Sequence, residues 1–197
     1  MGGTTKKILK NLPKISDIAE KYDIPSREEM SKALESRIGK VLAEKFAGAV
    51  VAVCGLGGLG SNIAISLARS GVGKLILVDF DRVDMSNLNR QQYKVSQLGM
   101  EKPTALLENI REIAPYVEIE ARCTKLDEVN FSSILSSAQV ICEAFDVPED
   151  KSKLANLVLE NLCDKVLISS SGMAGIDSAN KIKTRKIAEN FYICGDG

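Results

Sequence analysis

Short apolar runs alternate with segments of helical periodicity along most of the chain. Strand-like runs cover 49–54, 74–79, 117–122, 138–142 and 165–170. Helical spacing of apolar residues covers 60–70, 101–113, 149–163 and, more weakly, 131–137. This alternation predicts a doubly wound α/β fold, in which right-handed crossovers build a mainly parallel sheet. Two further extended runs, near 181–187 and 190–194, are close enough in sequence to pair as antiparallel strands at one edge.

The first part of the chain has a different character. Residues 1–25 are polar and irregular, which predicts a flexible lead or a docking arm. Ser26 and Glu29 then match a helix capping box, and apolar residues follow at helical spacing as far as Phe46. We therefore expect an N-terminal helix, and we expect 26–197 to form a single nucleotide-binding domain.

A glycine-rich turn joins the first strand to the next helix, in the sequence VVAVCGLGGLGSN. Gly55, Gly57 and Gly60 match G-x-G-x-x-G, with Gly58 between them, and glycine lets the backbone approach a phosphate closely. The N-terminus of the following helix attracts the same phosphate. Asp79 follows about 20 residues later, where Rossmann-like folds place the acid that binds ribose hydroxyls. This setting predicts a nucleotide site; the alternative is a tight turn that binds no ligand.

A long polar insert of about twenty residues follows Asp79, and ordered loops of this length are usually functional. Arg90 lies in the insert, and Lys102 lies in the first turn of the next helix. A lysine there opposes the helix dipole, so a nearby anion explains it better than the helix does. With Asn87, these cations predict a triphosphate site, although singly each is typical of a solvated surface charge. Asp81 would position the loop or a metal ion, or would belong to a solvated acidic turn.

Asp146 follows a predicted strand, at the edge where open α/β sheets bind ligands. A carboxylate at this edge can hold Mg²⁺ against phosphate oxygens. A cap for the helix that follows would explain the same residue, and the sequence leaves both interpretations open.

Composition narrows the classes of function. The 197 residues include 26 basic and 26 acidic side chains, so no overall field favours nucleic acid or an anionic membrane. No apolar run is long enough to span a membrane and no signal peptide is recognisable, which predicts a cytoplasmic protein. Histidine is absent, which excludes acid–base and nucleophile pairs built on it.

The five cysteines indicate reduced thiols, because their number is odd and two of them, Cys54 and Cys142, fall in predicted core strands. No two are spaced as C-x-x-C, so a zinc tetrathiolate is not expected. We interpret the cysteines mainly as packing residues.

Several motifs together resemble the ThiF/MoeB family, the bacterial relatives of ubiquitin-activating enzymes. They are GLGGLGSN, VDFDRVDMSNLNRQQY, a lysine at the head of the next helix, and EAFD. The ending NFYICGDG is similar to the short ThiF-like class, which lacks zinc-binding cysteine pairs. The resemblance implies an ATP-dependent adenylyltransferase that activates the C-terminal glycine carboxylate of a small ubiquitin-like carrier protein and releases pyrophosphate. Thiamine-type biosynthesis is the pathway that this class favours.

The resemblance also implies roles for particular residues. The glycine turn and Asp79 would hold adenosine and ribose. Asn87, Arg90 and Lys102 would contact the phosphates, and Asp146 would hold Mg²⁺ near the α-phosphate. Relatives are commonly homodimers, and some lend an arginine from an N-terminal helix to the partner's site, a role for which Arg37 is the candidate here. No cysteine of this chain matches the sulfur-transferring cysteine of longer relatives.

Three other functions remain open at this stage. Some relatives activate a carbonyl on modified tRNA and produce a cyclised base, although the neutral charge argues mildly against a tRNA partner. An NAD-dependent oxidoreductase would explain the glycine turn and Asp79, but it would leave the polar insert and Lys102 unexplained. A scaffold without activity would not need Arg90, Lys102 and Asp146 together.

Overall fold

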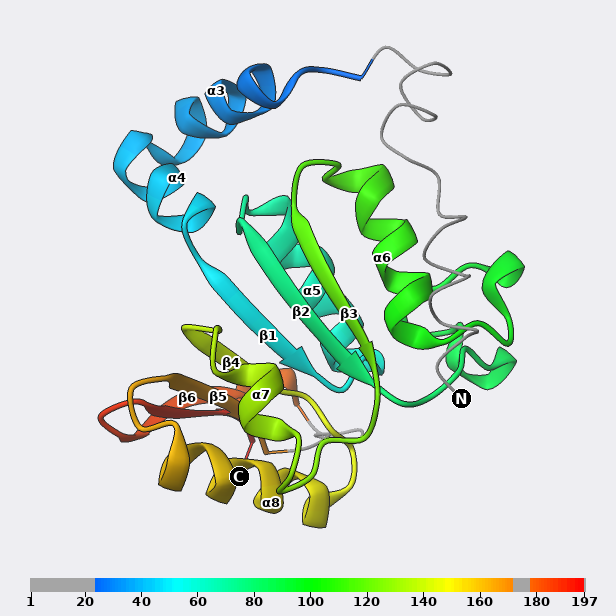
Figure 1. The fold of residues 1–197 in the computed structure, drawn as a ribbon, viewed down its shortest axis with the longest axis vertical. Coiled ribbons are helices and arrows are strands. Elements are labelled where there is room, and N and C mark those ends of the chain that lie inside the picture. Colours follow the sequence, from blue (N-terminus) through cyan, green and yellow to red (C-terminus); the bar gives the residue numbers. More distant parts are fainter. Residues whose placement is uncertain (1–23, 172–177, 197) are drawn as a thin grey trace.

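The computed structural model describes residues 24–171 and 178–196, in which strands and helices alternate (Figure 1). The strands are β1 (Val50–Cys54), β2 (Lys74–Asp79), β3 (Glu118–Cys123), β4 (Val140–Glu143), β5 (Val166–Ser170), β6 (Lys183–Ala188) and β7 (Phe191–Gly195). The α-helices are α3 (Arg27–Ile38), α4 (Lys40–Ala47), α5 (Gly58–Arg69), α6 (Lys102–Ile113), α7 (Phe131–Leu135) and α8 (Pro148–Asn161). Each strand and helix predicted from residue 49 onward is present, with ends displaced by a few residues.

The strands form one seven-stranded sheet in the order β3-β2-β1-β4-β5-β7-β6. All neighbours are parallel except β6 and β7, which pair antiparallel at one edge. β7 itself runs parallel to β5, so β6 is the only strand of this sheet that opposes the others. The chain order reverses between β1 and β4, and such a switch point is where doubly wound sheets bind ligands. The predicted Rossmann-like α/β class is confirmed.

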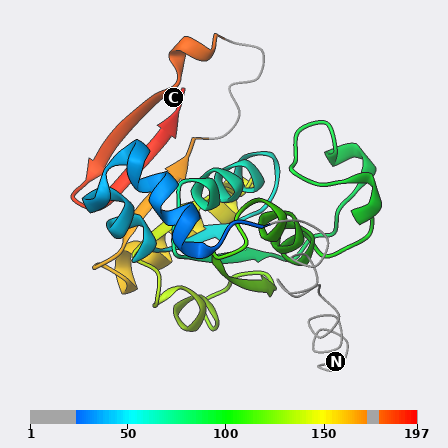
Figure 2. The same cartoon turned by 90° about the horizontal axis from the view of Figure 1, so that it is seen from above.

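Helices cover both faces of the central strands, and alternate residues of β1 are therefore buried on opposite sides of the sheet. Val51 and Val53 pack in a cluster with residues of α5 and α6. Ala52 and Cys54 pack in a second cluster with residues of α7 and α8. Strands buried on both faces are typical of parallel sheets. Figure 2 shows β6 and β7 at one side of the molecule and the polar insert, in green, projecting from the other.

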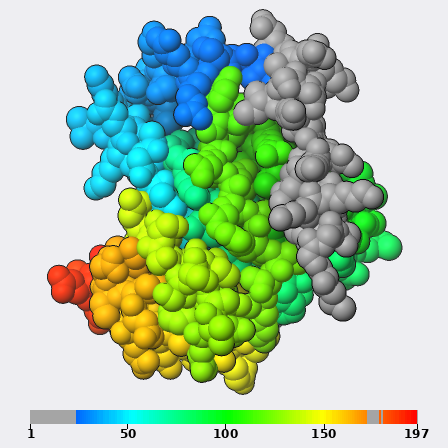
Figure 3. Space-filling view, in the orientation of Figure 1, coloured from blue at the N-terminus to red at the C-terminus, as the bar shows by residue number. Residues whose placement is uncertain are grey.

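The N-terminal helix begins as the sequence predicts but does not continue as one helix. The capping box is present, since Glu29 N–H donates to Ser26 Oγ at 3.2 Å and Ser26 N–H donates to the Glu29 carboxylate at 2.7 Å. Gly39 has a φ of 83°, a conformation that no residue inside a right-handed helix adopts. The prediction of a single helix was therefore wrong, and Gly39 separates α3 from α4. These two helices lie at the end of the molecule opposite α8 (Figure 3).

The cysteine interpretation is confirmed only for the two strand residues. Cys54 and Cys142 are buried, whereas Cys123 and Cys163 are exposed and cannot be core residues. The described residues contain no cluster of side chains that could hold a metal ion by itself. Across the same ranges, no helix has the length and apolar character needed to cross a membrane.

Candidate functional site

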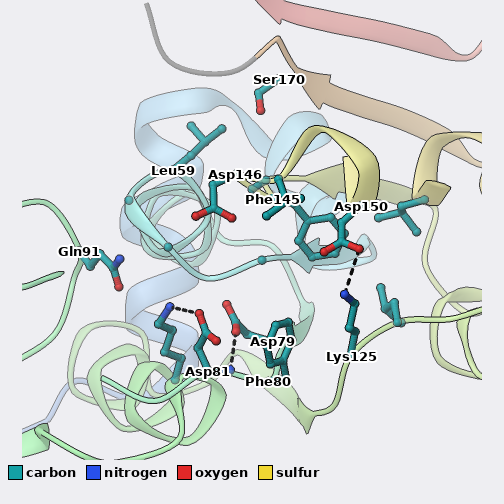
Figure 4. Close-up of a pocket in the computed structure, with 18 of the residues that line it drawn as sticks. Leu59, Asp79, Phe80, Asp81, Gln91, Lys125, Phe145, Asp146, Asp150 and Ser170 are labelled. Carbon is teal, nitrogen blue, oxygen red and sulfur yellow. Dashed lines mark hydrogen bonds and ion pairs between the residues drawn. The ribbon is translucent and has the colours of Figure 1, made fainter. Parts of the chain in front are cut away.

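A cavity of about 700 Å³ lies at the carboxyl ends of the central strands (Figure 4). Predicted site residues line it from four separate segments: the glycine turn, the end of β2, the polar insert with the start of α6, and the end of β4. They are Gly55, Gly57, Gly58, Asp79, Asp81, Asn87, Arg90, Lys102 and Asp146. Gly60 does not line the cavity. Arg37 lies in the last turn of α3, outside the lining.

The glycines of the turn serve two different needs. Gly55 has a φ of 89°, and a Cβ there would meet the Ala144 carbonyl at 2.8 Å. A Cβ at Gly60 would lie 1.8 Å from the Gly55 carbonyl oxygen. These two glycines are required by the turn itself. A Cβ at Gly57 or Gly58 would meet only side chains at 3.4 Å or more, so these two leave the backbone open toward the cavity.

The turn leads directly into α5 without a side-chain cap. The N-cap residue is Gly57, which offers no side-chain acceptor to the first N–H groups of the helix. Such groups carry a partial positive charge and bind anions. Because Gly57 and Gly58 line the cavity, this helix end is suited to a phosphate group.

Asp79 is a buried acid whose side chain accepts hydrogen bonds from the backbone on two sides of the site. One carboxylate oxygen accepts a hydrogen bond from Leu56 N–H at 2.6 Å, and the other accepts from Asp81 N–H at 2.8 Å. The residue is only 7% exposed. Asp79 therefore couples the glycine turn to the end of β2, and each oxygen retains a lone pair for a ligand hydroxyl.

Lys102 has a protein partner in this structure. Its Nζ lies 2.8 Å from the Asp81 carboxylate, and its backbone N–H donates to the Asp81 carbonyl at 3.0 Å. The lysine side chain is 6% exposed and the aspartate side chain 51%. The sequence predicts an anion beside Lys102, and in this structure the Asp81 carboxylate is that anion. Asp81 is half exposed, as the interpretation of a solvated acidic turn requires, and it pairs with Lys102 as well.

Arg90 is held at the rim of the cavity by the polar insert. Its guanidinium donates to the Ser86 carbonyl at 3.1 Å and to the Asn89 side chain at 3.0 Å. Its carbonyl accepts from the Asn62 side chain, on α5, at 3.2 Å. The aliphatic part of Arg90 lies over Gly58. The insert therefore brings a cation to the N-terminal end of α5.

Sequence reasoning missed the amides that fix the insert in place. The Gln97 side chain donates to the Ala105 carbonyl at 2.9 Å and to Asn109 Oδ1 at 3.0 Å. Asn109 donates to the Gln92 carbonyl at 2.7 Å. Tyr93 donates its hydroxyl to the Leu56 carbonyl at 2.7 Å, and its burial raises the pKa of that hydroxyl. Side chains that hydrogen-bond across a loop in this way have no regular spacing in the sequence, so no sequence pattern predicted them.

Asp146 is an exposed carboxylate at the end of β4. The N-cap of α8 is Val147, and no side chain caps that helix. The alternative interpretation of Asp146 as a helix cap was therefore wrong. Figure 4 shows that Asp146, from the end of β4, reaches the same cavity as Asp79 and Asp81, from the end of β2.

The other end of the cavity is largely apolar. Phe80, Leu126, Leu154 and Leu157 line it, and a Lys125–Asp150 ion pair of 3.1 Å crosses it. None of these was predicted as a site residue. A cavity with an apolar end and a polar, glycine-lined end fits a flat base joined to phosphates.

The donor set also fits a magnesium ion that arrives with a nucleotide. Mg²⁺ usually takes one or two carboxylates and completes its coordination with phosphate oxygens and water. Asp146 offers such a carboxylate, since within 24–171 and 178–196 no hydrogen bond or ion pair engages its side chain.

No activated thiol was found near this site. Burial raises the pKa of Cys142 to about 11 and also raises that of Cys54. The pKa of Cys123 is raised as well, first by burial and then by Glu101. A reactive thiolate needs a lowered pKa, so these three cysteines are poor nucleophiles.

Comparison with known proteins gives a consistent result. The ThiF family model matches residues 30–183. A Bacillus subtilis tRNA threonylcarbamoyladenosine dehydratase is 34% identical over 157 residues, which are 79% of this chain and 61% of that protein. Ubiquitin-like modifier-activating enzyme 5 of Caenorhabditis elegans is 43% identical over 77 residues, 39% of this chain and 18% of that enzyme. The chain thus spans less than two thirds of the length of either relative.

Solved structures show the same fold. The E. coli tRNA N6-threonylcarbamoyladenosine dehydratase in complex with AMP is 26% identical, with a TM-score of 0.75 over 84% of this chain and 68% of that one. The same E. coli enzyme in complex with ATP gives a TM-score of 0.78 at 21% identity, over 88% and 84% of the two chains. Since the family model covers most of the sequence, the chain belongs to the ThiF family.

Proposed function

We propose that this protein is an ATP-dependent adenylyltransferase that activates a carboxylate. The observation that carries the proposal is one cavity whose glycine-lined end holds Arg90 and Lys102 and whose other end is apolar, in a chain of the ThiF family. A structural relative binds AMP, the group that an adenylyltransferase transfers. Family membership argues against an NAD-dependent oxidoreductase.

Adenylylation of a carboxylate requires no general acid or base from the protein. A carboxylate has a pKa of about 3.5 and is ionised at neutral pH. One of its oxygens attacks the α-phosphorus of ATP, the bond from that phosphorus to the bridging oxygen breaks, and pyrophosphate leaves. The product is an acyl adenylate, and no proton has to be moved. A chain without histidine can therefore catalyse the step by alignment and charge neutralisation.

The polar residues of the cavity that the sequence singles out each have a role in this proposal. Asn87, Arg90 and the N-terminus of α5 bind the phosphates, and Asp79 binds the ribose. Lys102 releases Asp81 and turns to a phosphate oxygen when ATP enters, which needs only a change of partner for one Nζ. Asp146 holds Mg²⁺, which when bound supplies positive charge beside the phosphate oxygens.

A carboxylate on a modified tRNA is the first candidate acceptor. The relative aligned over most of this chain is named for dehydration of such a nucleoside. Loss of water from a threonylcarbamoyl group requires a carboxylate oxygen to leave, and adenylylation makes that oxygen a leaving group. β6 also carries exposed Lys183 and Arg185, and it starts opposite Gly195, at the same sheet edge as the cavity. A basic strip there suits a phosphate backbone.

The C-terminal glycine carboxylate of a small ubiquitin-like carrier protein is the second candidate. It is favoured by the similarity to a ubiquitin-like modifier-activating enzyme, which falls within 77 residues, and by the zero net charge of the chain. A Gly-Gly tail is thin enough to reach the α-phosphate. Thiamine-type sulfur transfer and a homodimer with Arg37 acting across it belong to this candidate and remain predictions.

Pyrophosphate release in a single turnover tests the proposal and separates the acceptors. The protein is mixed with MgATP and either a threonylcarbamoylated tRNA or a carrier ending in Gly-Gly. Release that depends on the tRNA supports the first acceptor, and release that depends on the carrier supports the second. A carrier extended by one residue and an unmodified tRNA are the matched controls, and neither should react. ATP binding with no release of pyrophosphate from ATP in the presence of either acceptor would contradict adenylylation.

A further inference from the structure

A buried ion pair lies directly behind the turn that carries Asp146. Glu143, the last residue of β4, has a fully buried side chain, and Lys151 on α8 is 13% exposed at its side chain. Lys151 Nζ lies 3.1 and 3.3 Å from the two Glu143 carboxylate oxygens. Neither residue lines the cavity, and the proposed chemistry does not use them directly.

The Glu143 carboxylate fixes the backbone that leads into Asp146. One of its oxygens accepts a hydrogen bond from Phe145 N–H at 2.6 Å, and the other accepts from the Ser169 hydroxyl. From the opposite side, Ala144 N–H donates to the Cys54 carbonyl at 2.8 Å. The turn is thereby attached to β1 through the backbone and to β4 through a side chain. Asp146 itself makes no such contact, so its position depends on this turn.

Lys151 joins the same turn to a second strand. Its Nζ also donates to the Ser170 hydroxyl at 2.7 Å and lies 3.3 Å from the Ser170 carbonyl. Ser170 ends β5 and lines the cavity. Lys151 lies in the first turns of α8, where the helix dipole disfavours a cation. The Glu143 carboxylate therefore explains why a lysine occupies this position.

Stability alone does not account for such a pair. Moving two charges out of water is costly, and apolar residues of similar size often stabilise a fold as well or better. The pair instead fixes the positions of the ends of β4 and β5, because its six short contacts join these two strand ends to α8. We propose that Glu143 and Lys151 are positioning residues that hold Asp146 in place to receive Mg²⁺ with the nucleotide. This inference rests on the proposed function for the ligand, and on the geometry alone for the positioning.

Two measurements on the full chain test it. The double variant E143Q/K151M removes both charges together and avoids leaving one of them buried alone. We expect amide hydrogen exchange of Phe145, whose N–H donates to Glu143, to quicken at least tenfold in this variant, while the circular dichroism spectrum is retained. We also expect the ratio of ATP dissociation constants in EDTA and in Mg²⁺ to fall toward one, with the value in EDTA unchanged. A merely structural role would weaken binding equally in both conditions.

Control variants separate the possible outcomes. Lys74→Met removes the ion pairs of a partly buried lysine with Glu118, at 2.9 Å, and with Glu120, at 3.2 Å, at the opposite end of the sheet, and it should change neither measurement. Asp146→Asn should lose the Mg²⁺ dependence without faster exchange. Unchanged exchange at Phe145 in the double variant overturns the positioning role, and so does faster exchange with an intact Mg²⁺ dependence. If the wild type binds no ATP while exchange at Phe145 quickens, the proposed function fails and the fixed turn stands.

Discussion

Lys102 and Asp81 form an ion pair of 2.8 Å in which the cation is buried and the anion is half exposed. Asp81 thus occupies the lysine in the absence of a nucleotide, and an arriving phosphate competes with it. Lys102→Met removes one charge-assisted contact to phosphate, worth about 1.5–3 kcal/mol. ATP should therefore bind roughly 10- to 100-fold more weakly. Titration calorimetry measures this, and an unchanged affinity would remove Lys102 from the phosphate site.

Replacing the other partner should have the opposite effect on binding. Asp81→Asn leaves the Lys102 charge without its counter-charge, so the free energy of unfolding should fall by about 1–3 kcal/mol. The same change frees Lys102 for phosphate, and ATP should bind at least as tightly as to the wild type. Urea unfolding and calorimetry measure the two effects. Weaker ATP binding in this variant would mean that Asp81 contacts the nucleotide or its metal ion directly.

Arg90 offers a test of charge neutralisation in the reaction. Arg90→Ala removes an exposed cation at the rim of the cavity, so folding should be unaffected. Adenylylation should slow by about 10²- to 10³-fold, the usual loss for one stabilising donor. Arg69→Ala, at the opposite end of α5, is the matched control and should leave the rate unchanged. A similar rate for both variants would refute the role of Arg90.

The glycine turn predicts a contrast between two substitutions. Gly60→Ala places a Cβ 1.8 Å from a backbone oxygen, and it should destabilise the fold by about 3 kcal/mol or more. Gly58→Ala meets only the Arg90 side chain, at 3.4 Å, and should leave the melting temperature within a few degrees of the wild type while weakening ATP binding. Thermal denaturation with and without ATP distinguishes the two. Equal destabilisation by both variants would contradict the division of roles among these glycines.

The buried cysteines make stability depend on alkaline pH. Burial raises the pKa of Cys142 from its ordinary value of 9.0 to about 11. The folded state therefore keeps a proton that the unfolded state releases. The stabilising contribution is complete below pH 9 and is lost as the pH rises toward 11, with about 1 kcal/mol lost by pH 10. Urea unfolding under reducing conditions at pH 8 and pH 10 should show this loss, and Cys142→Ala should show less of it. An equal loss in both proteins would contradict the assignment.

Local patterns in the sequence were sufficient for the fold and for the glycine-lined end of the cavity, but not for its apolar end. Apolar periodicity predicted the strands and helices, and the glycine turn with Asp79 predicted a nucleotide site, because these signals lie within short segments. The break at Gly39 was missed because the apolar spacing continues across it while the backbone does not. The Glu143–Lys151 pair was missed because a glutamate at a strand end and a lysine on a helix both resemble surface residues. Only the packing of α8 against β4 and β5 brings them together.

The pairing of Lys102 with Asp81 shows the same limit within the site. The sequence indicates that Lys102 needs an anion, but it does not tell whether that anion belongs to the protein or to a ligand. The structure supplies the first, and the proposed function adds the second. The division of the chain at residue 25 remains a prediction, since residues 1–23 lie outside the described ranges.

The most direct test of the central claim is exchange of labelled pyrophosphate into ATP, measured with Mg²⁺ and an acceptor carboxylate. Adenylylation is reversible at the acyl adenylate, so the wild type should incorporate label only when the acceptor is present. Arg90→Ala and Asp146→Asn should reduce the exchange by two or more orders of magnitude, and Arg69→Ala should not. Undiminished exchange in both site variants, or tight ATP binding with no exchange for the tRNA and the carrier protein alike, would contradict the account.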